Sequence, residues 1–249
     1  MPRVRSLERL AVIVDAATEL FGRVGFLQAQ MVDIAAAAGV SVGTLYNYVE
    51  GKEALLLLCV ENPFGGAGPA RTLPVPVLDR VALIEAMEAT LERQVRVPAL
   101  EHVLERPRRS DPSAALPEIL DQLFELLART RRAADAMERC ANEAPDLADL
   151  FYRNVRARLL AQLSTYCAGL IRDDAITATR RPEIAARFIL ETTTWWARHR
   201  HHDPERLELD DREARRACVA LVTHGLCGRL DRNGSVPGPG GGADARAAT

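Results

Sequence analysis

Apolar residues recur at intervals of three and four positions along nearly the whole chain, and the alternation typical of β-strands is scarce. The first such stripe runs from Leu7 to Phe21 and is followed by Gly22 and Gly25, which predicts a helix over residues 6–23. Further amphipathic stretches predict helices over roughly residues 79–97, 116–142, 146–172, 182–202 and 211–230. The hydrophobic pattern therefore predicts an all-α protein.

Three short segments follow the first predicted helix: QMVDIAAAAG, SVGTLYNYV and GKEALLLLCVE. Gly39 ends the first of them, and glycine accepts the left-handed conformation of a tight turn after a helix. Ser41 is a suitable N-cap for the next helix, while Ile34 and Leu45 are expected to face inward. This arrangement is typical of a helix-turn-helix, whose second helix presents its N-terminal residues to the major groove of DNA.

The second helix of this pair carries side chains suited to DNA. The residues expected to be exposed toward the groove are Val42, Gly43, Thr44, Tyr46 and Asn47. Glycine permits a close approach to base edges, the threonine offers a hydroxyl and a methyl group, and the asparagine offers a bidentate amide. The phenols of Tyr46 and Tyr48 are expected to donate to phosphates. Lys52, the only lysine of the chain, begins the following helix, where the positive end of the helix dipole also favours a phosphate.

These motifs resemble the DNA-binding domain of the TetR family of bacterial transcriptional regulators. The resemblance covers about residues 6–62 and is carried by AATELFGRVGF followed by AAAAGVSVGTLYNYVEGKEALL. It implies a homodimer that binds a near-palindromic DNA operator, a pocket in a larger C-terminal domain, and repression relieved by a small molecule. It also adds Gln30 and Ser41 to the DNA-binding residues; Gln30 stands where the family commonly has a threonine that caps the second helix.

The predicted DNA-binding domain carries few cations. Residues 1–60 contain five basic and six acidic side chains, a net charge of −1. Affinity for DNA derives largely from neutralisation of phosphates. The balance therefore leaves open an alternative, a TetR-like ligand-binding module that has lost specific DNA binding. An enzyme is the third hypothesis, but the chain contains no P-loop or H-E-x-x-H motif.

The composition of the 249 residues divides the chain into regions. The stretch NPFGGAGPARTLPVPVLDR is too rich in proline and glycine to be helical and marks a boundary. We expect a helix-turn-helix DNA-binding domain over residues 6–62 and a helical ligand-binding and dimerisation domain over residues 79–230. The polar, glycine-rich residues 233–249 are expected to be a disordered tail.

Several patterns argue against other classes of protein. The five cysteines contain no C-x-x-C pair, and the histidines of HRHHD are better explained as cations at a helix C-terminus, so no metal or other cofactor is expected. The longest apolar run, ALLLLCV, is far shorter than the roughly 20 residues of a membrane span, and no secretory signal is recognised. We expect a cytoplasmic protein without membrane contact.

The second predicted domain carries the candidate ligand and dimer residues. Its helices have few charges on their inner faces, which favours a small hydrophobic or aromatic effector. The candidate ligand-binding residues are His102, Phe124, Phe151, Tyr166, Phe188 and Trp195. The last two predicted helices have more apolar surface than one chain needs, and pairing of two copies would bury it. The candidate dimer residues are Ile184, Phe188, Leu221 and His224.

Overall fold

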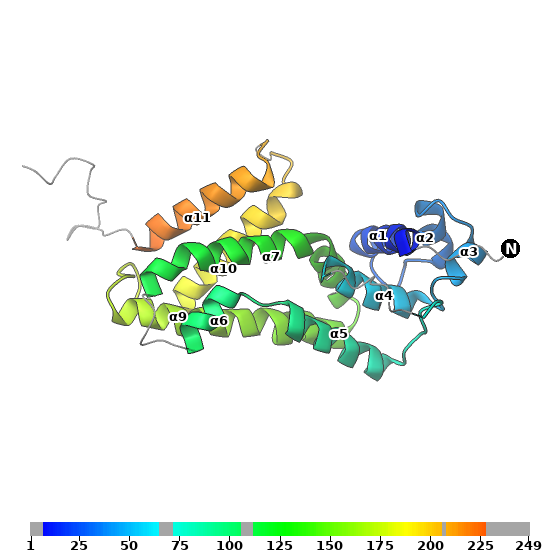
Figure 1. Cartoon of the computed structure of the whole chain (residues 1–249), viewed down its shortest axis with the longest axis horizontal. Helices are drawn as coiled ribbons and strands as arrows, with labels where there is room; N and C mark the ends of the chain where they lie inside the picture. The colour runs from blue at the N-terminus through cyan, green and yellow to red at the C-terminus, as the bar shows by residue number, and fades with distance from the viewer. Residues whose placement is uncertain (1–6, 65–71, 106–111, 206–207, 228–249) are drawn as a thin grey trace, which may run out of the picture. The chain divides into compact units, whose positions relative to one another are not determined.

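The computed structural model describes residues 7–64, 72–105, 112–205 and 208–227 (Figure 1). These residues form helices joined by turns, and their one pairing of β type is an isolated bridge between Val49 and Val75. The prediction of an all-α fold is confirmed. No helix in the described ranges is long and apolar enough to cross a membrane. The predicted disordered tail at 233–249 lies outside the described residues.

Contacts between residues group the chain into two compact units. Unit 1 comprises Met1–Arg96 and Glu125–Leu159, and unit 2 comprises Val97–Phe124 and Leu160–Thr249. Unit 1 therefore contains the predicted DNA-binding domain together with segments that follow the proline-rich stretch. The boundary expected between residues 62 and 79 stays a prediction.

Unit 1 begins with the four helices of the predicted DNA-binding domain. A short 3-10 turn and the helix after the proline-rich stretch follow. The unit is completed by the second part of a long helix and by a short helix that continues into a π-helical segment. In chain order these elements are α1(Leu7–Val24), α2(Met31–Ala37), α3(Val42–Tyr46), α4(Lys52–Glu61), η1(Asn62–Phe64), α5(Arg80–Gln94), part of α7(Pro112–Ala141), α8(Pro145–Ala148) and η2(Asp149–Arg156).

The core of unit 1 is built around α4. All residues from Ala54 to Val60 are buried, as expected for a helix that is apolar on every side. This helix packs against α1 and α5 (Figure 1), and Phe21 of α1 is fully buried in the same cluster. Burial of each large side chain stabilises the fold by about 1.5–3 kcal/mol. The same burial raises the pKa of the Cys59 thiol to about 12, which keeps it protonated and unreactive.

Two glycines with positive φ shape the turns before and within the helix-turn-helix. Gly25 follows α1 with φ of 87°, and Gly39 follows α2 with φ of 64°. The turn at Gly39 is closed by a hydrogen bond of 2.9 Å, which the Val40 amide donates to the Ala35 carbonyl. Left-handed φ values are readily adopted only by glycine, so both turns depend on these residues.

Unit 2 contains the remaining helices. They are α6(Pro98–Glu105), the first part of α7, α9(Ala157–Arg172), which starts in unit 1, α10(Pro182–Ala197), η3(His199–His201) and α11(Asp211–Cys227). Helices α10 and α11 pack against each other. Helix α6 has no counterpart among the helices expected from the sequence, and the single helix expected over 146–172 is formed as α8, the π-helical η2 and α9.

Candidate nucleic-acid interface

The helix-turn-helix consists of α2, the turn at Gly39 and α3. Ser41 adopts an extended conformation and caps α3, since its hydroxyl accepts a hydrogen bond from the Thr44 amide at 3.1 Å. The two hydroxyls of Ser41 and Thr44 are also 2.8 Å apart. The predicted N-cap is therefore confirmed. Gln30 occupies the N-cap position of α2 but makes no capping hydrogen bond with its side chain, which leaves its exposed amide open to DNA.

One face of α3 is buried and the other is open. Ile34 of α2 and Leu45 of α3 are fully buried, as the hydrophobic pattern predicts. Val42, Gly43, Tyr46 and Asn47 are exposed, and Thr44 is half-buried. A Cβ atom placed on Gly43 would have no neighbour within 4 Å. The exposed face combines the small Gly43 and the polar Asn47 with Val42 and Tyr46, and it fits the close approach of a recognition helix to base edges.

Tyr48 does not lie on the exposed face of α3. Its side chain is only 5% exposed and belongs to the core of unit 1, whereas Tyr46 is 47% exposed. The reason is that α3 ends at Tyr46, so Tyr48 no longer follows the helical face. The structure thus gives the Tyr48 ring a packing role instead of the phosphate contact expected from the sequence.

Lys52 begins α4 as predicted, but its ammonium group already has partners. The Nζ atom donates to the carbonyl oxygens of Leu27 at 3.3 Å and Ala29 at 3.1 Å, and it lies 4.5 Å from the centre of the Phe26 ring. Each partner belongs to the loop between α1 and α2. Lys52 therefore holds the entry to the helix-turn-helix in place, in addition to any contact with phosphate.

Two acidic residues that the sequence analysis did not single out as contacts also hold the helix-turn-helix. Glu143 accepts a hydrogen bond from the Leu27 amide at 2.8 Å, and Glu50 accepts one from the Val77 amide at 3.2 Å. Beside Glu50, the Val75 backbone exchanges hydrogen bonds with Tyr48 and Glu50 at 2.8 and 2.9 Å. No local pattern signals the contact of Glu143, because its partner is 116 positions away.

The candidate ligand residues are distributed over both units. In unit 2, Phe124 and Tyr166 are buried, whereas His102, Phe188 and Trp195 are exposed. Phe151 is half-buried against the core of unit 1. None of the six lines either of the two cavities described below. Their role in ligand binding stays a prediction.

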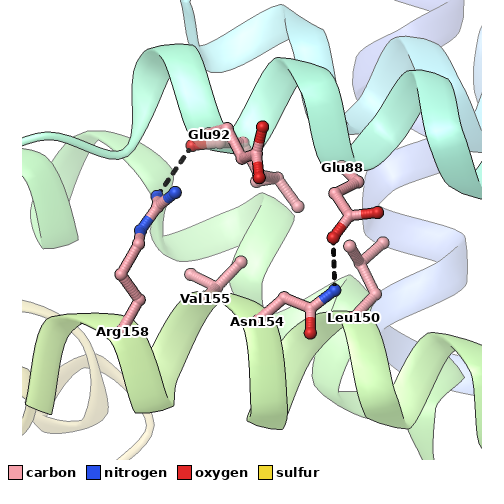
Figure 2. Close-up of a pocket in the computed structure, with 7 residues that line it drawn as sticks. Glu88, Glu92, Leu150, Asn154, Val155 and Arg158 are labelled. Atoms are coloured by element: carbon pink, nitrogen blue, oxygen red, sulfur yellow. Dashed lines mark hydrogen bonds between the residues drawn. The ribbon is translucent and has the colours of Figure 1, made fainter. Parts of the chain in front are cut away.

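A cavity of about 240 Å³ lies within unit 1 between α5 and the η2–α9 segment (Figure 2). Its walls combine aliphatic side chains with charged and amide groups. The lining residues are Glu88, Leu91, Glu92, Leu150, Asn154, Val155 and Arg158. Such a mixture of apolar walls and a few polar groups is typical of sites for small molecules.

Comparisons with known proteins agree with this architecture. Residues 13–59 match the family described as bacterial regulatory proteins, tetR family. No curated protein sequence matches the chain. Among solved structures, a HlyIIR mutant protein is 16% identical with a TM-score of 0.55, and 90% of this chain and 100% of that chain are covered. A TetR-like transcriptional regulator from Rhodococcus sp. RHA1 is 20% identical with a TM-score of 0.50, and 91% of this chain and 100% of that chain are covered.

A third similar structure is AibR in complex with isovaleryl coenzyme A and operator DNA. It is 18% identical with a TM-score of 0.51, and 86% of this chain and 97% of that chain are covered. At these identities the three structures establish a shared fold. The capped α3, the exposed face beside it and the match over residues 13–59 define a DNA-binding helix-turn-helix. Residues 13–59 of the chain thus match the DNA-binding region of the tetR family of bacterial regulatory proteins.

Proposed function

We propose that the chain is a dimeric transcriptional repressor of the cytoplasm that binds a near-palindromic operator and is released by a small molecule. The exposed face of α3 carries this proposal, because it is held on a capped helix within the matched region. The side chains proposed to contact DNA are Gln30, Ser41, Val42, Gly43, Thr44, Tyr46 and Asn47, with Lys52 supporting the loop between α1 and α2.

The response to a small molecule is supported by the general likeness to AibR, whose structure holds both isovaleryl coenzyme A and operator DNA. For this chain the sequence favours a hydrophobic or aromatic effector that is bound and not transformed. Release requires the effector to prefer the conformation that does not bind DNA, and coupling of this kind amounts to about 1–3 kcal/mol.

The proposal is tested by selecting DNA duplexes from a random pool with the purified full-length chain. We expect enrichment of an inverted repeat whose half-sites lie about 34 Å apart, one turn of DNA. A TetR-like module without specific DNA binding would enrich no sequence while still binding small molecules. That outcome would refute the repressor and favour the alternative hypothesis.

Asn47→Ala is expected to relax the base preference at one position of each half-site. Loss of a bidentate amide contact costs about 1–3 kcal/mol of discrimination against the wrong base. The measurement is fluorescence anisotropy with the selected operator and its single-base variants. Asn142→Ala serves as the matched control, because Asn142 is an exposed asparagine outside the helix-turn-helix. An unchanged base preference in the Asn47 variant would remove this residue from the interface.

The proposed dimer is supported by apolar surface on the last two helices. Ile184 and Phe188 are exposed on α10, and Leu221 of α11 is 62% exposed. Beside Leu221 lies a shallow cavity of about 330 Å³, lined by Pro117, Asp121, Arg216, Val219, Ala220, Thr223 and His224. A second copy packed on this face would cover the apolar groups.

Leu221→Arg is expected to convert the protein to monomers, because a charge placed in an apolar interface between two copies is left unpaired. Operator affinity should fall at least about tenfold, since a monomer engages one half-site only. Light scattering coupled to gel filtration measures the mass. Val81→Arg is the matched control, because Val81 is an equally exposed valine on α5. A parent protein that is monomeric at micromolar concentration would contradict the dimer.

A further inference from the structure

The cavity in unit 1 is bounded by two helix faces with polar links between them (Figure 2). At one side Asn154 donates to the Glu88 carboxylate at 2.6 Å. At the other side one guanidinium nitrogen of Arg158 donates to the carbonyl oxygens of Leu91 and Val95, both at 3.2 Å. These links hold α5 beside η2 and α9 while the space between them stays open.

The charges at this cavity are unbalanced. Its lining contains two carboxylates, of Glu88 and Glu92, and a single cation, Arg158. The guanidinium of Arg158 faces backbone carbonyls at the C-terminus of α5, and within the described part of the chain it makes no ion pair with either carboxylate. The Glu92 carboxylate likewise forms no hydrogen bond or ion pair with a described residue. The site therefore attracts a positive charge.

The size and the walls restrict the ligand further. Leu91, Leu150 and Val155 supply aliphatic surface beside the carboxylates. A volume of about 240 Å³ is below the range of roughly 300–1,000 Å³ found for drug-sized ligands, so the ligand must be small. A short apolar body that ends in a protonated amine satisfies both the aliphatic walls and the carboxylates.

Each wall of the cavity is connected to one flank of the helix-turn-helix. The segment before α5 is bonded to the chain just after α3, through the Val75 backbone and the side chain of Glu50. The segment before α8 and η2 is bonded to the chain just before α2, through Glu143 and the Leu27 amide. Arg80 of α5 and Asp146 of α8 tie the two walls together with hydrogen bonds of 2.6 and 2.7 Å.

The geometry points to this cavity as the effector site and to a small organic amine as the class of effector, an inference that rests on the proposed function. The ammonium group binds between Glu88 and Glu92, and its apolar body lies against Leu91 and Val155. A ligand that separates α5 from η2 displaces the two flanks of α2 and α3 relative to each other. The recognition helix then leaves its position for binding DNA.

The test uses the full-length protein and three probes of similar length: hexylamine, hexanol and hexanoate. Binding is measured without DNA by calorimetry and saturation-transfer NMR. We expect hexylamine to bind at least tenfold more tightly than hexanol, and hexanoate not to bind. In the double variant Glu88→Gln and Glu92→Gln the preference for the amine should disappear. Glu85→Gln is the matched control, because Glu85 is an exposed glutamate of α5 outside the cavity.

Release of the selected operator is followed in parallel by anisotropy. In the parent, hexylamine should weaken operator binding between fourfold and a hundredfold, and in the double variant it should not. The double variant also controls for the effect of a cation on DNA itself. Equal affinities for hexylamine and hexanol, or an unchanged amine affinity in the double variant, would overturn the assigned ligand class or site. Amine binding without operator release would overturn its role as effector.

The experiments distinguish failure of the proposed repressor from failure of the proposed amine site. If the selection enriches no operator, the repressor is refuted, whereas the titrations without DNA still decide whether the cavity binds amines. Release of the operator by isovaleryl coenzyme A and by none of the amines would support the repressor and overturn the amine site, because a coenzyme A thioester is much larger than this cavity.

Discussion

Gly43→Leu is expected to leave the fold intact and to lower specific operator affinity by at least about a hundredfold. The substituted side chain begins in open space, since a Cβ at this position has no neighbour within 4 Å. Glycine is also a poor helix former, so the replacement favours α3 by about 0.5–1 kcal/mol. The isobutyl group would instead project from the face that is proposed to enter the groove, and it would keep the backbone of α3 away from the base edges.

This combination of unreduced stability and lost affinity separates a DNA-facing position from a structural one. Urea unfolding measures the stability, and anisotropy with specific and random duplexes measures the affinity. Gly43→Ala is the control that adds a single methyl group, and it should have a much smaller effect. If Gly43→Leu bound the operator like the parent, α3 would not be the recognition helix. A loss of stability together with binding would show that Gly43 serves the fold.

The helix-turn-helix could be predicted from the sequence because its signals are local. Gly39 adopts a positive φ directly after α2, and Ser41 caps α3 through an amide only three positions away. The inward-facing Ile34 and Leu45 follow from helical periodicity. A one-dimensional pattern contains this information, so the two helices and the inward-facing Ile34 and Leu45 were predicted correctly.

The contacts that hold the helix-turn-helix in place could not be predicted in this way. Lys52 reaches carbonyls 23 and 25 positions away, and Glu143 reaches an amide 116 positions away. The burial of Tyr48 depends on where α3 ends, which is set by the pairing of the following residues with Val75. Each feature results from packing between distant segments, for which the sequence carries no local signal.

The cavity was missed for a related reason. Periodicity indicates that a side chain faces inward, but it does not show where two helices separate. The candidate pocket was therefore drawn from aromatic residues such as Phe124 and Tyr166, which the structure buries. The cavity of unit 1 is lined partly by charged residues that no sequence motif singled out, and one wall is a π-helical segment. Such segments are frequent at functional sites, but no sequence rule predicts them.

A second large effect is expected at the corner between α10 and α11, where Arg200 is buried. Its guanidinium donates to the carbonyl of Trp196 at 2.7 Å, to the carbonyl of Leu209 at 2.9 Å and to the carboxylate of Asp211. The Arg200 side chain is 8% exposed and that of Asp211 is 43% exposed. Asp211→Ala would leave a nearly buried cation without its opposite charge, and this is strongly destabilising.

We expect Asp211→Ala to lower the free energy of unfolding by about 2–3 kcal/mol, less than for a fully buried pair because water reaches the carboxylate. The corresponding fall in Tm is roughly 5–10 °C. Asp149→Ala breaks an exposed pair with Arg153 and serves as the control, with an expected loss below about 0.5 kcal/mol. Thermal and urea unfolding measure both variants.

The double variant Arg200→Met and Asp211→Ala identifies the cause of the loss. Methionine fills similar space without a charge, so removal of both partners should cost less than the sum of the single changes. A double variant as unstable as the sum would show that Asp211 does not compensate the charge of Arg200. The two backbone carbonyls would then suffice for the buried guanidinium. Asp211 would act through its other contacts, which include the His201 ring at 3.2 Å, and as an acidic residue in the first turn of α11.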